Sequence, residues 1–216
     1  MSSIKLYYYP ASGPARIALM AARLVGVPLQ IEIVDLMKRE QFSEAYLKIN
    51  PQHCVPTLDD DGFILSESRA IACYLADKYG TDDSIYPKDI KKRAIVNQRM
   101  YFDCSTLLVK MRAICHPIIF NIENEIKENL RDDFNASLSV LDKYLENNEW
   151  VAGEHVTIAD TTIFASMSGI FAAGWDLSYF PNIQRWLKNC SNLPGYEEIK
   201  EGAKIYGDLV KKNLKQ

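Results

Sequence analysis

The sequence lacks a long hydrophobic run and an excess of one charge. No window in its 216 residues approaches the roughly 20 consecutive apolar residues that a membrane-spanning helix needs. The 25 basic and 28 acidic side chains nearly balance, and the basic ones form no stripe of the kind that binds a phosphate backbone. We therefore expect neither a membrane nor a nucleic acid as a partner.

Cysteine is scarce, and the clusters that hold metals are missing. The five cysteines show neither C-x-x-C pairing nor the His/Cys spacing of a zinc site, so we expect free thiols and no metal. The N-terminus has no basic region followed by a long apolar stretch, which is the pattern of a secretory signal. These absences predict a cytoplasmic protein.

The hydrophobic pattern of the first 80 residues alternates between strand and helix. A β-prone run at 6–9 is followed by apolar residues at helical spacing up to Val25, and Gly26 is placed to end that helix. Leu29, Ile31 and Ile33 then alternate as in a second strand. The chain is therefore predicted to begin β-α-β.

A hairpin and a helix complete this first unit. After a polar segment at 35–50, two short β-prone runs flank Asp61-Gly62, a pair that favours a tight primed turn. Ser68 is expected to cap the next helix, and Gly80 to end it. The order β-α-β, loop, β-β-α is typical of a thioredoxin-like domain.

The rest of the chain has helical periodicity. A polar segment at 82–89 containing Pro87 is the predicted linker between a domain at 1–81 and an all-helical domain at 90–216. One long helix runs towards Pro117, another spans 130–145, a capping box stands at Thr157/Asp160, and Pro181 opens a further helix. The predicted fold class is α/β followed by an all-α helical bundle.

Three short motifs in the first domain, together with their spacing, carry a family resemblance. They are YYPASGPAR at 8–16, NPQHCVPTL at 50–58 and ESRAI at 67–71, and further similarity lies in the linker and at 98–103. The chain resembles the cytosolic glutathione transferases, and within them the insect delta and epsilon classes. The resemblance covers nearly the whole sequence.

The resemblance implies an enzyme that conjugates the thiolate of reduced glutathione to small hydrophobic electrophiles in xenobiotic detoxification. It implies glutathione as co-substrate, no permanently bound cofactor, a homodimer and an electrophile site in the helical domain. Two alternatives remain open: a non-catalytic carrier of glutathione or hydrophobic ligands, and a transferase-like module for protein interaction.

Ser12 is the predicted catalytic residue. The thiol of free glutathione has a reference pKa of about 8.5, so something must stabilise the thiolate at neutral pH. Ser12 precedes the helix that Pro14 begins, where its hydroxyl can donate to sulfur and the helix dipole favours an anion. Tyr9, at the end of the first strand, is the alternative donor.

The other glutathione contacts follow from the resemblance. Pro56 would be a cis proline that leaves the backbone of Val55 free to pair with the cysteinyl residue, and His53 would bind the glycyl carboxylate. Glu67 and Ser68 would hold the γ-glutamyl ammonium and carboxylate. The full predicted set is Ser12, Gln41, His53, Cys54, Val55, Pro56, Glu67, Ser68 and Arg69, with Arg69 facing either the ligand or a neighbouring subunit.

The sequence departs from the family pattern at two places. Gln41 stands where a second histidine is common, so it can hydrogen-bond the glycyl end but cannot carry charge. The predicted electrophile pocket, Leu108, Met111, Ile114 and Cys115, is apolar and has few rings to stack on aromatic substrates. His116 and His155 are interpreted as ordinary helix-end or loop residues.

Overall fold

A four-stranded mixed sheet forms the centre of the N-terminal half. The computed structural model describes residues 4–215, and its strands β1 (Ile4–Tyr8), β2 (Leu29–Ile33), β3 (Thr57–Asp60) and β4 (Phe63–Ser66) lie in the order β2-β1-β3-β4. β1 runs parallel to β2 and antiparallel to β3. The hairpin turn forms as predicted, with positive φ at Asp61 and Gly62.

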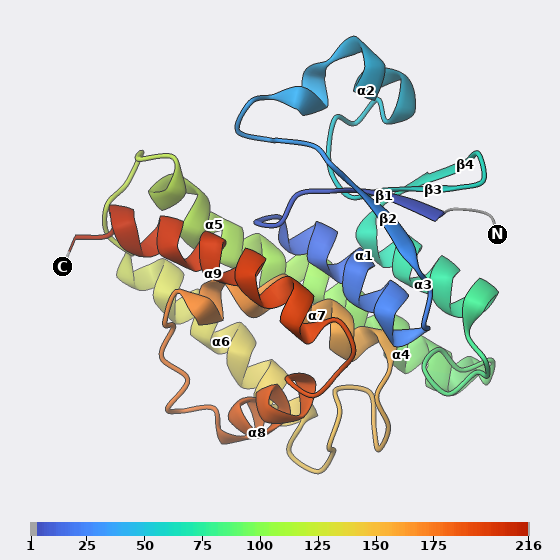
Figure 1. Ribbon diagram of the computed structural model, residues 1–216. Coiled ribbons are helices and arrows are strands. Elements are labelled where there is room, and N and C mark those ends of the chain that lie inside the picture. Colours follow the sequence, from blue (N-terminus) through green and yellow to red (C-terminus); the bar gives the residue numbers. More distant parts are fainter. Residues whose placement is uncertain (1–3, 216) are drawn as a thin grey trace.

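Two helices cover one face of this sheet, and a short third helix lies on its other side. Helices α1 (Gly13–Leu24) and α3 (Ser68–Tyr79) lie between the sheet and the helical half, whereas α2 (Glu44–Ile49), preceded by a 3₁₀ turn at Glu40–Phe42, lies on the opposite side (Figure 1). Gly26 has φ +71°, the left-handed conformation expected after α1. The fold is thioredoxin-like, as predicted.

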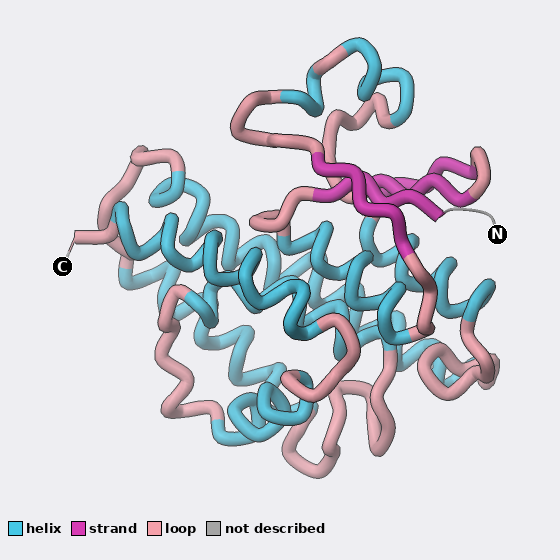
Figure 2. Tube along the Cα trace, viewed as in Figure 1, coloured by secondary structure: helices cyan, strands magenta, loops and turns pink. Residues whose placement is uncertain are grey.

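The C-terminal half consists of helices joined by loops, with no strand among its described residues (Figure 2). Its helices are α4 (Ile90–Phe102), α5 (Leu108–Ile119), α6 (Glu128–Tyr144), α7 (Ile158–Ala172), α8 (Pro181–Cys190) and α9 (Tyr196–Asn213). α7 is buried over almost its whole length and packs against both α1 and α9. No helix among residues 4–215 has the length and apolar character that a bilayer span needs.

The structure corrects several details of the sequence prediction. The long helix does not stop at Pro117 but continues to Ile119, and a π-helical turn at Asp103–Leu107 separates α4 from α5. Glu67, not Ser68, is the residue before α3, and Ser68 is already in the first turn. The polar segment at 35–50 contains helix α2, which was not predicted. The bounds of α9 were not predicted either.

The capping box at the start of α7 is present and joins three segments of the helical half. Asp160 accepts hydrogen bonds from the Thr157 backbone at 2.9 Å, from the Val151 backbone at 2.8 Å and from the Trp186 indole at 3.0 Å. Burial raises the pKa of Asp160 to about 6. These bonds fix the start of the helix against which α1 packs.

Candidate functional site

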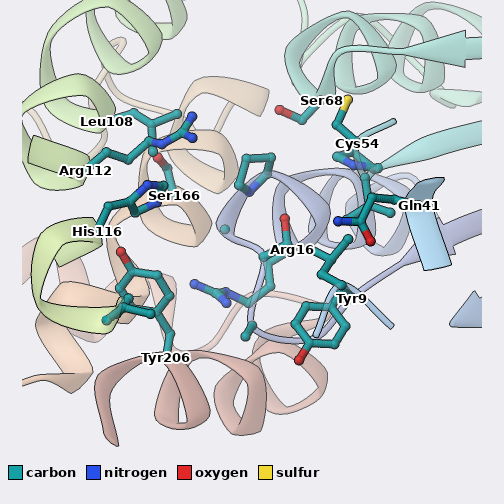
Figure 3. A pocket seen from close by; sticks show the side chains of 18 of the residues that line it. Tyr9, Arg16, Gln41, Cys54, Ser68, Leu108, Arg112, His116, Ser166 and Tyr206 are labelled. Carbon is teal, nitrogen blue, oxygen red and sulfur yellow. The ribbon is translucent and has the colours of Figure 1, made fainter. Parts of the chain in front are cut away.

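A cavity of about 620 Å³ lies where the loops after β1 and β2, the segment before β3 and the start of α3 face helices α5 and α9. This volume is within the usual range for a small-molecule site. Figure 3 shows the cavity with Tyr9, Gln41, Cys54 and Ser68 on one side and Leu108, Arg112, His116 and Tyr206 on the other. Every residue of the predicted glutathione set lines this cavity: Ser12, Gln41, His53, Cys54, Val55, Pro56, Glu67, Ser68 and Arg69.

Ser12 is held by the first turn of α1. It is the residue before the helix, and its hydroxyl oxygen accepts a hydrogen bond from the Ala15 backbone N–H at 3.3 Å. Its own O–H remains free to donate, because capping uses only the oxygen lone pair. Pro14 lies in this first turn, as expected from its missing N–H.

A buried arginine lies beneath the Ser12 loop. The guanidinium of Arg16 donates to the Pro10 carbonyl at 2.9 Å and to the Ser168 hydroxyl at 3.1 Å, joining α1 to α7. It has no ion-pair partner among residues 4–215, and burial lowers its pKa to about 10. Because this charge is buried, water screens it weakly, and it raises the electrostatic potential at the wall of the cavity.

The segment before β3 presents free backbone groups to the cavity. The Val55-Pro56 peptide bond is cis, as predicted. The preceding Cys54 carbonyl is fixed by the Tyr46 hydroxyl at 2.7 Å and the Asn50 amide at 3.1 Å. The Val55 backbone makes no hydrogen bond within the described part of the chain, so it can pair with an extended ligand.

The junction of β4 and α3 combines polar groups with a buried ion pair. The Ser68 hydroxyl accepts from Arg69 at 3.1 Å, which leaves its O–H available to a ligand. Arg69 also pairs with Asp103 in the π-helical turn. Burial raises the pKa of the Asp103 carboxyl, and the Arg69 charge opposes that shift. Arg69 therefore lines the cavity while linking α3 to the helical half of its own chain.

The opposite end of this side places two residues that were not predicted, Arg39 and Phe42, next to the predicted His53. The Arg39 guanidinium lies 5.0 Å from the Phe42 ring centroid, and the Phe42 and His53 rings are 4.7 Å apart. All three line the cavity beside Gln41, whose buried Oε1 has no partner in the described structure. Arg39 thus provides a cation near the position where Gln41 provides none.

Backbone strain is concentrated on this side of the cavity. Arg39, His53 and Glu67 all have positive φ although none is glycine, with values of 63°, 46° and 69°. Such conformations cost about 1–3 kcal/mol each and persist where surrounding structure enforces them, frequently at ligand sites. Their grouping is an independent indication of a binding site.

The helical side of the cavity differs from the prediction. Leu108 and Met111 line it, whereas Ile114 and Cys115 are not among the lining residues and are buried in the core. The lining also includes Arg112, His116, Phe120, Tyr206 and Leu209, none of which was predicted. His116, interpreted as an ordinary helix-end residue, therefore faces the cavity. The i, i+4 spacing of Leu108, Arg112 and His116 on one helix face was the available signal.

Tyr9 also lines the cavity, but its hydroxyl end points away from Cys54 and Ser68 (Figure 3). Burial raises the pKa of Tyr9, with the Asp35 charge adding to the shift. No cluster of side chains able to hold a metal ion occurs within residues 4–215.

Two family models match the chain. The N-terminal domain of glutathione S-transferases matches residues 6–83, and the C-terminal domain matches residues 104–194. The chain belongs to the glutathione S-transferase family.

Solved structures support the same assignment. Glutathione S-transferase unclassified 2 from Bombyx mori is 64% identical with a TM-score of 0.96, covering 100% of both chains. A delta-class glutathione transferase from Nilaparvata lugens is 47% identical with a TM-score of 0.93, covering 97% of this chain and 99% of that one. A Drosophila mojavensis homologue, solved with bound glutathione, is 36% identical with a TM-score of 0.93, covering 99% of each chain.

These relatives are insect glutathione transferases, as the sequence motifs predicted. This transferase has a cavity with two unlike sides, one built mainly from loops of the thioredoxin-like half and the other from helices α5 and α9.

Proposed function

We propose that this transferase binds reduced glutathione along the thioredoxin-like side of the cavity, and that Ser12 stabilises its thiolate for attack on an apolar electrophile. The observation that carries the proposal is the free O–H of Ser12 at the N-terminus of α1, in the same cavity as the Val55 backbone and the Ser68 hydroxyl. The helix dipole adds to the stabilisation of an anion at this point.

The arrangement of polar groups suits an extended tripeptide. The γ-glutamyl carboxylate would accept from Ser68 and the start of α3, while Glu67 would pair with the ammonium. The cysteinyl residue would pair with the Val55 backbone next to Cys54 and Pro56. His53, Gln41 and Arg39 would hold the glycyl carboxylate. The Drosophila mojavensis homologue with bound glutathione supports this choice of ligand.

Conjugation transfers no proton at the bond-forming step. The thiolate sulfur forms a bond to the electrophilic carbon, and the leaving group departs with its electron pair or an unsaturated acceptor takes up the charge. Leu108 and Met111 would contact the apolar body of the electrophile. Glutathione is then a co-substrate consumed in each turnover, and we expect no permanently bound cofactor.

The assembly and location remain part of this proposal. We expect a cytoplasmic homodimer of chains with domains 1–81 and 90–216 joined by the linker 82–89. Large apolar side chains are exposed along β4 and α4, among them Phe63, Ile90 and Tyr101, and a partner subunit would cover them. Light scattering coupled to size exclusion should give twice the mass of the 24.6 kDa chain.

Retention on immobilised glutathione, combined with turnover of 1-chloro-2,4-dinitrobenzene, tests the function. Retention with turnover supports the transferase. Retention without turnover would indicate the non-catalytic carrier, and failure of both would indicate an interaction module. The free Ser12 hydroxyl favours the first outcome, because a carrier has no need of a donor at the thiol.

A further inference from the structure

The helical side of the cavity carries an unpaired positive charge. Arg112 on α5 lines the cavity and forms no hydrogen bond or ion pair with any residue in the described range 4–215. Its charge lowers the pKa of His116 in addition to the larger effect of burial, and it partly opposes the burial that raises the pKa of Tyr206. Arg112 is therefore close to both side chains, in agreement with their grouping in Figure 3.

No acidic side chain balances Arg112 on this side. α5 contains no Asp or Glu, and the carboxylates of α9 lie outside the cavity lining. Glu67, on the glutathione side, is the single acidic residue among those that line the cavity. Arg16 adds a second cation without a carboxylate partner in the described chain. The potential at the helical side is thus positive.

An apolar wall accompanies the charge. Leu108, Met111 and Leu209 line the cavity on this side. Tyr206 and Ser166 line it too, but their hydroxyls are buried below its surface, next to Cys115 and Asp103 respectively. Such a surface fits a ligand with an apolar body and an anionic oxygen group.

We propose that Arg112 makes this transferase selective for apolar electrophiles that carry a carboxylate. The inference rests on the proposed transferase function and adds a substrate class to it. The guanidinium offers a planar pair of N–H donors to the two carboxylate oxygens, which a lysine or a neutral donor does not reproduce. His116, whose pKa is lowered by burial, contributes a neutral ring rather than a second charge at pH 7.

A matched pair of substrates isolates this contact. 4-Chloro-3-nitrobenzoate and 4-chloro-3-nitrobenzamide undergo the same substitution, in which the thiolate forms the C–S bond and chloride leaves with the electrons of the C–Cl bond. They differ in charge at the group opposite the chlorine. The quantity to measure is kcat/KM for each, divided by its uncatalysed rate with glutathione, and then the ratio of carboxylate to amide.

The wild-type ratio should exceed one, and Arg112→Gln should reduce it about fivefold. This corresponds to about 1 kcal/mol, the upper end of the range for a solvent-accessible ion pair. Arg112→Lys should retain part of the preference. Lys110→Gln is the matched control, because Lys110 is a cation on the same helix that pairs with Asp133 and does not line the cavity. Its ratio should equal that of the wild type.

Two further readouts separate this role from others. If Arg112→Gln lowers turnover of both substrates equally and raises the pKa of bound glutathione, Arg112 acts on the thiolate and the selectivity inference is overturned. A wild-type ratio of one or less also overturns it, while turnover of the amide would leave the transferase function intact. If the enzyme turns over none of the three substrates, the carboxylate, the amide and 1-chloro-2,4-dinitrobenzene, both proposals are refuted.

Discussion

The two sides of the cavity are built by different means. The glutathione side uses loops, a cis peptide bond, strained backbone and helix starts, so that much of its surface is main chain. The electrophile side uses side chains spaced along α5 and α9. A main-chain surface recognises one constant peptide, whereas side chains on a helix face can change without altering the fold. The first side is therefore suited to a fixed ligand and the second to variable substrates.

The pair of Arg69 and the buried Asp103 links the start of α3 to the helical half. Asp103→Asn keeps the shape of the side chain but leaves the Arg69 charge buried without compensation, so it should reduce the free energy of unfolding by about 3 kcal/mol. The midpoint of urea-induced unfolding measures this. Asp133→Asn, which removes the exposed pair with Lys110, is the control and should cost less than about 1 kcal/mol. Equal losses would show that the link is no stronger than a surface pair.

On the glutathione side, the largest catalytic effect is expected at Ser12. Ser12→Ala removes a hydrogen bond to an anion, about 1.5–3 kcal/mol, so the pKa of bound glutathione should rise by about one to two units. A raised thiol pKa lowers the thiolate fraction at neutral pH, and activity should partly return in alkali. Ultraviolet absorbance of the thiolate against pH, at saturating glutathione, measures the shift.

Two controls accompany this experiment. Ser12→Thr keeps both the helix cap and the hydroxyl, and it should preserve the titration, which separates thiolate stabilisation from loss of the α1 cap. Tyr9→Phe removes only a hydroxyl that points away from Cys54 and Ser68 and should leave the titration unchanged. If Tyr9→Phe raises the thiol pKa and Ser12→Ala does not, the enzyme is of the tyrosine type.

The two ends of the glutathione side should also contribute unequally to the affinity for glutathione. Glu67→Ala removes a charged partner of the γ-glutamyl ammonium and should weaken glutathione binding by about 1.5 kcal/mol, roughly tenfold. Gln41→Ala should have a smaller effect, because Gln41 carries no charge and Arg39 stacks beside it on Phe42. Calorimetric titration gives both affinities. A loss at Gln41 equal to or larger than that at Glu67 would reject this ranking.

On the side built from local motifs, the residues predicted from the sequence all line the cavity. Ser12, Val55 and Ser68 lie in contiguous segments whose turn and cap chemistry is visible in the sequence, and the structure brings these segments to one cavity. The cation at Arg39 was missed because its contact with Phe42 depends on a positive φ at Arg39 that the sequence does not show.

Prediction was less complete on the helical side. Helical periodicity shows which residues share a face of the helix, but not whether that face lies against the cavity or in the core. Ile114 and Cys115 share the apolar character of Leu108 and Met111, yet they are buried in the core where α5 packs against the neighbouring helices. The same packing brings Tyr206, nearly 100 residues away in sequence, to the side chains of α5. Only the tertiary arrangement could place it there.

The smallest expected effect concerns the aliphatic wall of the electrophile side. Met111 lines the cavity as an adaptable side chain, and Met111→Phe would add a ring on which flat aromatic substrates could stack, a gain of about 1 kcal/mol or fivefold in relative kcat/KM. The measurement compares an aromatic electrophile, 1-chloro-2,4-dinitrobenzene, with an aliphatic one such as an alkyl iodide. Because Met111 is 4% exposed, the larger ring also tests whether the wall can adjust, and an overpacked core should appear as a lower melting temperature. Leu108→Phe, one turn earlier on the same helix, provides a second ring at the cavity. A preference unchanged in both variants would mean that the electrophile does not contact this part of α5.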